Sequence, residues 1–303
     1  MKPSQFWKQW EKTLTSVDEI DSFIRSIHQK WPDKTFAWRG AVNADWAMHS
    51  ALFRRVAWTR QAADPKAKYP NERILAEEEE KVIESARRWG LHSGARGRLS
   101  ALELLATLQH FGAPTRLLDI TFNPYMGVFF AVEEQVEHAS SDGRLFAIDV
   151  TSRLINDHAD YANWEHEPNA PWCGLAEKEW CAAALAWRPP AFDRRIAAQQ
   201  GAFLLGGVPS TAAGQWPKEP TPQSKKWKID ETRAAISVSM RVHKVDGNTK
   251  APMYPAYTVR IAANAKQTVR RALERLYGFS HATVYPDFPG FASYGMPTLR
   301  SKP

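Results

Sequence analysis

The chain lacks the features that mark several well-known protein classes. Its 303 residues include only two cysteines, Cys173 and Cys181, which excludes a disulfide framework and favours a reducing cytoplasm. Apolar runs stay well below the roughly 18 residues of a membrane span, and the polar, aromatic start has no signal-peptide core, so we expect no membrane partner. The P-loop, GxGxxG, GxSxG and HExxH motifs are all missing, which removes the common nucleotide-binding, serine-hydrolase and zinc-protease signatures.

Metal-ligating residues are also sparse. His158, His166, Cys173 and Cys181 lie within one short segment, but their spacing matches no zinc motif and no paired CxxC or HxxxH step occurs. The sequence therefore predicts no metal site.

Positive charge is concentrated near the C-terminus. The chain carries a net charge of +7, and residues 221–303 contain 14 lysines and arginines against 5 acidic residues. This asymmetry favours a polyanionic partner, although a solvated basic surface explains it equally simply. The candidate nucleic-acid contacts are Lys225, Lys226, Lys228, Arg270, Arg271 and Arg275, with Trp227 among them.

Short strands alternate with helices without regular βαβ spacing, which predicts an α+β fold. The expected helices lie within 1–31 and at 71–89, 99–111, 124–136 and 265–277, and Glu77 to Glu80 are expected on an exposed face. Strands are expected at 35–38, 115–121, 144–150, 203–205, 236–242 and 257–261. Residues 151–190 resemble an insertion or long loop, and residues 209–226 a mobile loop.

The most informative segment is Gln109-His110-Phe111-Gly112-Ala113-Pro114-Thr115-Arg116-Leu117-Leu118-Asp119-Ile120-Thr121. It predicts a helix end, a short strand, and a second helix with Asn123 as N-cap and Pro124 in the first turn. Capping does not explain an arginine and an aspartate within one strand. Two interpretations stay open: an internal Arg116–Asp119 ion pair that fixes the turn, or a ligand site.

Two shorter segments also attract attention. Arg39-Gly40 follows the aromatic strand Phe36-Ala37-Trp38, which suits a phosphate or carboxylate ligand but also a surface ion pair. Gln199-Gln200-Gly201 precedes an apolar strand, where a glutamine could bind a ribose or simply form a turn.

Taken together, these segments resemble the FRG-domain family, named for an aromatic-Arg-Gly motif. Trp38-Arg39-Gly40 matches that motif, and the Gln109–Asp119 run matches the family's central signature. Further similarity runs from Arg195 to Phe203 and from Arg271 to Asp287, so the resemblance spans about residues 36–296. It implies a helical segment at 1–35, an FRG-like domain at 36–296 and a tail at 297–303.

A more distant similarity connects the chain to ADP-ribosyltransferases. Arg39-Gly40, the segment from Thr121 to Ala131, and Gln200 to Leu205 occur in the order of that family's three core strands. The similarity implies split mixed and antiparallel sheets with flanking helices, and NAD as substrate. It implies that Arg39 binds the NAD pyrophosphate or ribose and that Thr121 orients the nicotinamide ribose. Asp119 and Arg116 would brace the strand, and the implied NAD-binding set is Arg39, Gly40, Thr115, Arg116, Thr121 and Asn123.

The chain departs from that family at its catalytic glutamate, where Gln200 stands instead. Asp119, Glu177 or Glu179 could supply the missing carboxylate, with His110 as acid or base. The implied catalytic set is Arg39, His110, Asp119, Thr121 and Gln200.

Two functions follow as hypotheses. The first is an NAD-dependent ADP-ribosyltransferase-like toxin or defence effector that modifies RNA, DNA or protein and has a neutralising antitoxin or chaperone as partner. The second is a non-catalytic FRG module that binds nucleic acid or a nucleotide through its basic C-terminal third.

Overall fold

The computed structural model of the chain describes residues 3–94, 97–155, 180–181, 183–189, 193–210, 227–245 and 254–296. Within this part, the α-helices are α1 (Pro3–Trp7), α2 (Val17–Lys30), α3 (Ala51–Ala63), α4 (Glu72–Arg88), α5 (Ala101–His110), α6 (Pro124–Val132), α9 (Arg194–Ala198), α10 (Ile229–Ala235), α11 (Lys266–Tyr277), α12 (His281–Val284) and α13 (Phe288–Gly290). Short 3-10 helices occur at Val136–His138 and Ala263–Ala265, and a π-helix at Phe291–Gly295.

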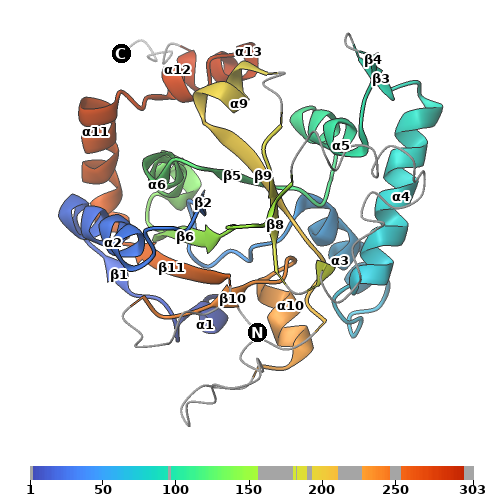
Figure 1. The fold of residues 1–303 in the computed structure, drawn as a ribbon, viewed down its shortest axis with the longest axis horizontal. Helices are drawn as coiled ribbons and strands as arrows, with labels where there is room; N and C mark the ends of the chain where they lie inside the picture. Colours follow the sequence, from blue (N-terminus) through green and yellow to red (C-terminus); the bar gives the residue numbers. More distant parts are fainter. Residues whose placement is uncertain are drawn as a thin grey trace, which may run out of the picture.

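Nine of the described strands form one mixed sheet (Figure 1). Its order is β1-β11-β6-β2-β5-β9-β8-β7, with β10 also beside β11. The strands are β1 (Thr13–Leu14), β2 (Phe36–Ala41), β5 (Leu118–Thr121), β6 (Gly143–Asp149), β7 (Leu154–Ile155), β8 (Leu185–Trp187), β9 (Gly201–Leu205), β10 (Arg241–Val242) and β11 (Pro255–Ile261). A separate hairpin joins β3 (Ser93–Gly94) to β4 (Gly97–Arg98). The predicted α+β class is confirmed.

The sheet is hydrogen-bonded unevenly along its width. β2 pairs with β6 through six residue pairs, but with β5 only through Trp38 and Thr121. β5 then pairs with β9 through four residue pairs. The sheet is therefore continuous, yet it is nearly divided between β2 and β5.

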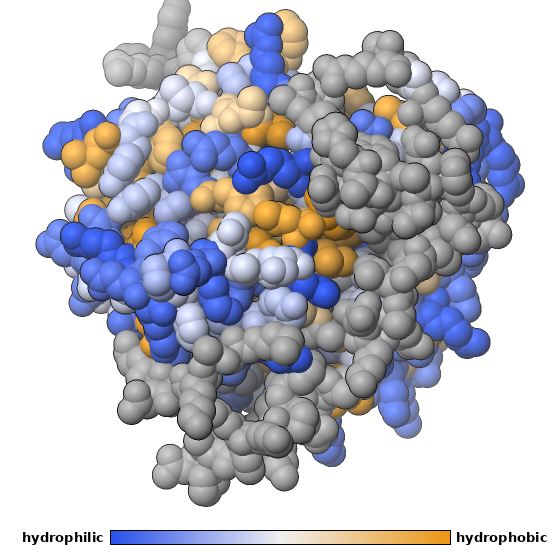
Figure 2. Space-filling model, viewed as in Figure 1, coloured by the Kyte–Doolittle hydropathy of each residue, from blue (hydrophilic) through white to orange (hydrophobic). Residues whose placement is uncertain are grey.

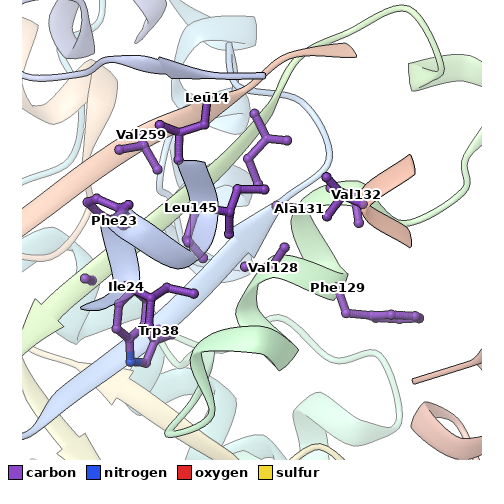
Figure 3. Close-up of a cluster of buried hydrophobic side chains, with 14 of the residues drawn as sticks. Leu14, Phe23, Ile24, Trp38, Val128, Phe129, Ala131, Val132, Leu145 and Val259 are labelled. Carbon is purple, nitrogen blue, oxygen red and sulfur yellow. The ribbon is translucent and has the colours of Figure 1, made fainter. Parts of the chain in front are cut away.

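Apolar side chains fill both faces of the sheet. One cluster joins α2, α6 and α11 to the β2–β6–β11 side, and Figure 3 shows Phe23, Trp38, Val128 and Leu145 within it. A second cluster contains Trp7 of α1 and Ala235 at the end of α10. Burial of this kind is the main source of folding free energy.

Local sequence signals set several helix ends. Ser16 accepts a hydrogen bond from the Glu19 amide at 3.2 Å and caps α2. Asn123 caps α6 by accepting from the Tyr125 and Met126 amides. Gly112 and Gly278 end α5 and α11 with φ angles of 87° and 69°.

The strand predicted at 236–242 is largely wrong. Ile236 forms only an isolated bridge to Met48, and just Arg241–Val242 lies in the sheet. The reason is that this segment bonds to two loops, because the Ser237 amide donates to Met48 O and the Ser239 amide to Gly207 O. A local alternation of apolar residues cannot distinguish such bridging from a strand.

Most of the predicted insertion at 151–190 and nearly all of the 209–226 loop lie outside the described residues, as does the 297–303 tail. At the edges of the first, β7 and β8 pair in parallel and extend the sheet beyond β9. None of the described helices combines the length and apolar character needed to cross a bilayer.

Candidate functional site

A cavity of about 390 Å³ opens where β2 and β5 separate. Its lining comes from β2, the end of α5, β5, the end of α6, the α9–β9 segment and Tyr285. The Trp38-Arg39-Gly40 motif, the central signature and the segment from Arg195 to Phe203 therefore meet at one place. Figure 2 shows hydrophobic residues at the centre of the molecular face that it presents, beside a largely hydrophilic region on the left.

Arg39 extends from β2 across the opening. Its Nη1 atom donates to the main-chain oxygen of Asp119 on β5. This bond bridges the two strands beside their single residue pair. Burial lowers the pKa of the guanidinium, and the charge of Asp119 partly opposes that shift. No carboxylate among the described residues forms an ion pair with Arg39. The hydrogen bond to Asp119 O thus holds the guanidinium in position without neutralising its charge.

Gly40 allows α6 to lie directly against β2. A Cβ atom at this position would lie 2.1 Å from the Gly127 carbonyl oxygen and 2.5 Å from the Ala131 amide nitrogen, both within α6. No side chain fits there without moving the helix. Gly40 also lines the cavity, but its demonstrable role is the approach of two main chains.

Three residues of the central signature form a hydrogen-bonded chain. Thr115, which is fully buried, donates to Gln109 Oε1. Gln109 Nε2 in turn donates to Asp119 Oδ1 at 2.7 Å. Gln109 and Asp119 both line the cavity. Thr115 therefore positions Gln109 through a hydrogen bond and does not itself line the cavity.

Arg116 has a different role from the one that either interpretation gave it. It is 1% exposed, and its Nε and Nη1 atoms lie 2.7 and 2.9 Å from Glu79 and Glu72 of α4. Burial opposes its charge, yet Glu79 and Glu72 together raise its pKa. The expected Arg116–Asp119 pair is wrong, and so is the expected exposure of Glu79, which is 1% exposed because it neutralises this arginine.

Three other predicted residues lie outside the cavity lining. Thr121 is fully buried, and its hydroxyl donates a hydrogen bond to Gln199 O at 2.8 Å. This bond stabilises the turn before β9. Asn123 is occupied as the cap of α6. Gln200 is exposed in a turn with φ of 46°, and the neighbouring Gln199 lines the cavity instead.

Glu133 is the cavity residue that sequence reasoning missed. It directly follows α6, is 8% exposed, and accepts hydrogen bonds from Tyr285 Oη at 2.6 Å and Tyr294 Oη at 3.1 Å. Gln135 Nε2 donates to its other oxygen at 3.2 Å. One signal was available: acidic residues are unfavourable at a helix C-terminus, so Glu133-Glu134 is an anomaly that needs a reason.

The same carboxylate explains why α6 ends at Val132 and not near residue 136. Glu133 leaves the helical conformation with ψ of 143°, which brings its side chain to the two tyrosines. Burial, followed by the Glu133 charge, raises the pKa of Tyr285, so its hydroxyl stays protonated and able to donate.

A second arginine in the cavity is already paired. Arg195 binds Asp287 with two hydrogen bonds of 2.7 Å, and this contact lowers the pKa of Asp287. Its guanidinium also lies 5.1 Å from the Tyr285 ring centre. Arg195 therefore fastens the C-terminal segment that carries Tyr285. His110 lies 3.5 Å from Asp193 and is part of the same lining.

The predicted nucleic-acid contacts do not form one continuous set in the described part. Lys225 and Lys226 lie outside it, as do the alternative carboxylates Glu177 and Glu179. Lys228 precedes α10, and Trp227 is 3% exposed and packed in the core. Arg270 is bonded to Val132 O and paired with Glu134, whereas Arg271 and Arg275 are exposed on α11.

His158, His166 and Cys173 also lie outside the described residues. The described residues hold no group of three or more His, Cys, Asp or Glu side chains suited to a metal ion.

Comparison with protein families gives one match. A model of the FRG domain matches residues 34–140, which include Arg39, the whole central signature and Glu133. No curated protein and no solved structure matches the chain. Arg195 and Tyr285, which complete the cavity, lie outside the matched range. The chain therefore contains an FRG domain over residues 34–140.

Proposed function

We propose that this cavity binds NAD and that the protein is an ADP-ribosyltransferase-like enzyme. The observation that supports the proposal best is that Arg39, whose charge no carboxylate neutralises, and the buried carboxylate Glu133 line one cavity. A guanidinium suits the negatively charged pyrophosphate of NAD, and a carboxylate suits the positive charge that develops on the ribose. The cavity's 390 Å³ also lies within the usual 300–1,000 Å³ range of ligand sites.

Arg39 is the anchor for the pyrophosphate. A guanidinium binds phosphate oxygens through two parallel hydrogen bonds and keeps its charge at any physiological pH. Its Nη1 contact to Asp119 O fixes the side chain before a ligand arrives. Trp46, Phe130 and Tyr285 supply aromatic surface in the same cavity, against which a base or nicotinamide ring could pack.

Glu133 takes the role of the catalytic glutamate, at whose position in the sequence this chain has Gln200. In the proposed reaction, the bond between ribose C1′ and the nicotinamide nitrogen breaks, and its electron pair leaves with nicotinamide. Positive charge develops on the ribose, and a fixed carboxylate beside it lowers the energy of that state. Hydrogen bonds from Tyr285 and Tyr294 hold Glu133 in place.

His110 is the candidate base for the acceptor. A lone pair of the acceptor attacks C1′ as the nicotinamide leaves, and the acceptor's proton passes to the imidazole. His110 is suited to this role because it lies at the end of α5 and its side chain is 26% exposed. Asp119 lies in the same lining and could share this task.

The single residue pair between β2 and β5 supports a further proposal about the topology of the sheet. We extend the proposal to a split-sheet topology of the ADP-ribosyltransferase kind, with the split between β2 and β5. The basic C-terminal third keeps RNA and DNA among the candidate acceptors, beside protein. A role as a toxin or defence effector, with a neutralising antitoxin or chaperone partner, belongs to the same proposal.

The test uses purified full-length protein and NAD. Calorimetric titration should show binding that Arg39→Ala weakens by about tenfold or more, whereas Arg275→Ala, which removes an exposed arginine of α11, leaves it unchanged. Biotinylated NAD with cell RNA, DNA and protein should then label one fraction. Glu133→Gln should retain NAD binding and lower labelling by about 100-fold.

Absence of NAD binding by the folded wild-type protein would refute the proposal. If salt-sensitive nucleic-acid binding were then found and survived Arg39→Ala, the non-catalytic FRG module would be the better interpretation.

A further inference from the structure

A second and larger cavity lies between α3, α4 and the end of α5. Its volume is about 590 Å³, and it shares no lining residue with the cavity that contains Arg39. Val56, Ile74, Val82 and Leu108 contribute apolar surface to its lining. We refer to it as the α3–α4 groove. It needs its own explanation, because the proposed NAD chemistry makes no use of it.

Charge is distributed unequally along the α3–α4 groove. On the α4 side, Lys81 and Glu78 form an ion pair at 2.6 Å and neutralise each other. On the α3 side, Arg55 and Arg60 line the groove without an ion pair to any described residue. The groove therefore has an apolar interior and one positively charged edge.

Arg60 provides the most specific observation. Its Nε atom is shielded from solvent and has no hydrogen-bond acceptor among the described residues. A shielded donor without an acceptor is costly, and such atoms in proteins usually find a partner. An anionic oxygen in the groove would be a natural acceptor once the flexible Arg60 side chain turns this donor toward it.

The groove also has an exposed aromatic residue in its lining. Trp89 is 81% exposed, directly follows α4, and lies near Leu91, which is 47% exposed. Large apolar side chains left exposed beside a cavity are typical of ligand or partner sites. They extend the apolar surface that a ligand could cover.

We infer that the α3–α4 groove binds an amphiphilic carboxylate, an aliphatic chain with one anionic head group. The chain would cover Val56, Ile74 and Val82, and the carboxylate would accept hydrogen bonds from Arg55 and Arg60. The volume of 590 Å³ is within the usual range for small-molecule sites. The inference is independent of NAD binding, since the two cavities have separate linings.

The test measures binding of dodecanoate, below its micelle concentration, to the full-length protein by calorimetry. Dodecyltrimethylammonium has the same chain and the opposite charge, and it should bind about tenfold more weakly or worse. Arg55→Ala combined with Arg60→Ala should lower dodecanoate affinity by about tenfold and abolish the preference between the probes. Arg25→Ala, which removes an exposed arginine of α2 outside the groove lining, is the matched control and should bind as the wild type does.

A second variant tests the location. Ser85 is exposed and lines the groove, so Ser85→Trp should fill it and reduce dodecanoate binding without removing a core side chain. Equal binding of both probes, or unchanged binding in the double arginine variant, would overturn the inference. So would full binding to Ser85→Trp, or no binding of dodecanoate at all.

Discussion

Arg39 and Arg116 both belong to sequence blocks that match the FRG domain, but they have opposite electrical surroundings. Arg116 is enclosed by Glu72 and Glu79, and it connects the central signature to α4. Arg39 lies at a cavity and donates to a carbonyl oxygen, without a carboxylate to neutralise it. Of these two motif arginines, only Arg39 therefore keeps a charge that no described carboxylate pairs with.

The largest expected effect comes from removing the neutralised arginine. Arg116→Ala leaves two acidic side chains near the core without their cation, so we expect a loss of about 3–5 kcal/mol in the free energy of unfolding. Chemical denaturation would measure it. If Arg116→Ala were as stable as the wild type, the assignment of Arg116 to the fold would be wrong.

His49 is a buried basic group that, unlike the two arginines, is kept neutral by burial. Burial lowers the pKa of His49 to about 4, from 6.5, and its ring nitrogen lies 2.8 Å from Arg233 O. The folded state therefore binds its proton less readily than the unfolded state. The associated stability is fully present above about pH 6.5 and is lost as the pH falls toward 4, up to about 3 kcal/mol.

Urea denaturation at pH 7.5 and pH 4.5 would measure this loss. His49→Gln keeps a donor for Arg233 O but does not titrate, so its stability should depend less on pH over that interval. A variant with the same pH dependence as the wild type would contradict the role of His49.

Gly40→Ala should destabilise the fold next to Arg39 without changing any charge. The new methyl group would meet the backbone of α6, and we expect a cost of about 2 kcal/mol. Gly201→Ala is the matched control in the same cavity, because a Cβ there would lie at an ordinary 3.5 Å from Ile196 O. Similar melting temperatures for the two variants would argue against close α6–β2 packing as the role of Gly40.

The smallest stability effect should come from Arg39→Ala. It removes a single guanidinium–carbonyl hydrogen bond, but it also removes a charge that burial disfavours. The two effects oppose each other, so we expect a net loss of about 1 kcal/mol. Thermal melting of Arg39→Ala and Arg116→Ala in parallel would compare the two arginines directly. Equal, large losses would mean that Arg39 also serves chiefly to stabilise the fold.

The sequence predicts what local chemistry determines. Ser16, Asn123 and Gly112 act within a few residues of their own position, so helix starts and stops were accessible. The resemblance to ADP-ribosyltransferases also grouped Arg39 with His110 and Asp119, and these three residues line one cavity. The strand at 236–242 failed because its partners are loops that are distant in the sequence.

The remaining site residues depend on contacts that no local pattern contains. Glu79 looks like one of four surface glutamates, and only the fold brings it 2.7 Å from Arg116. Glu133 depends on Tyr285 and Tyr294, which lie about 150 residues further along the chain. Thr121 and Gln200 have plausible chemistry, but backbone bonding and a turn direct them away from the cavity.

The direct approach of α6 to β2 at Gly40 also has a consequence for the proposed site. Arg39 is on the strand next to this glycine, and Glu133 follows the last residue of the helix. Main-chain contact thus fixes the relative positions of the backbone atoms from which the Arg39 and Glu133 side chains extend. In the proposed reaction, the distance between the ligand's phosphate and its reacting ribose carbon would have to match the separation of these two side chains. Shorter or longer molecules would be rejected.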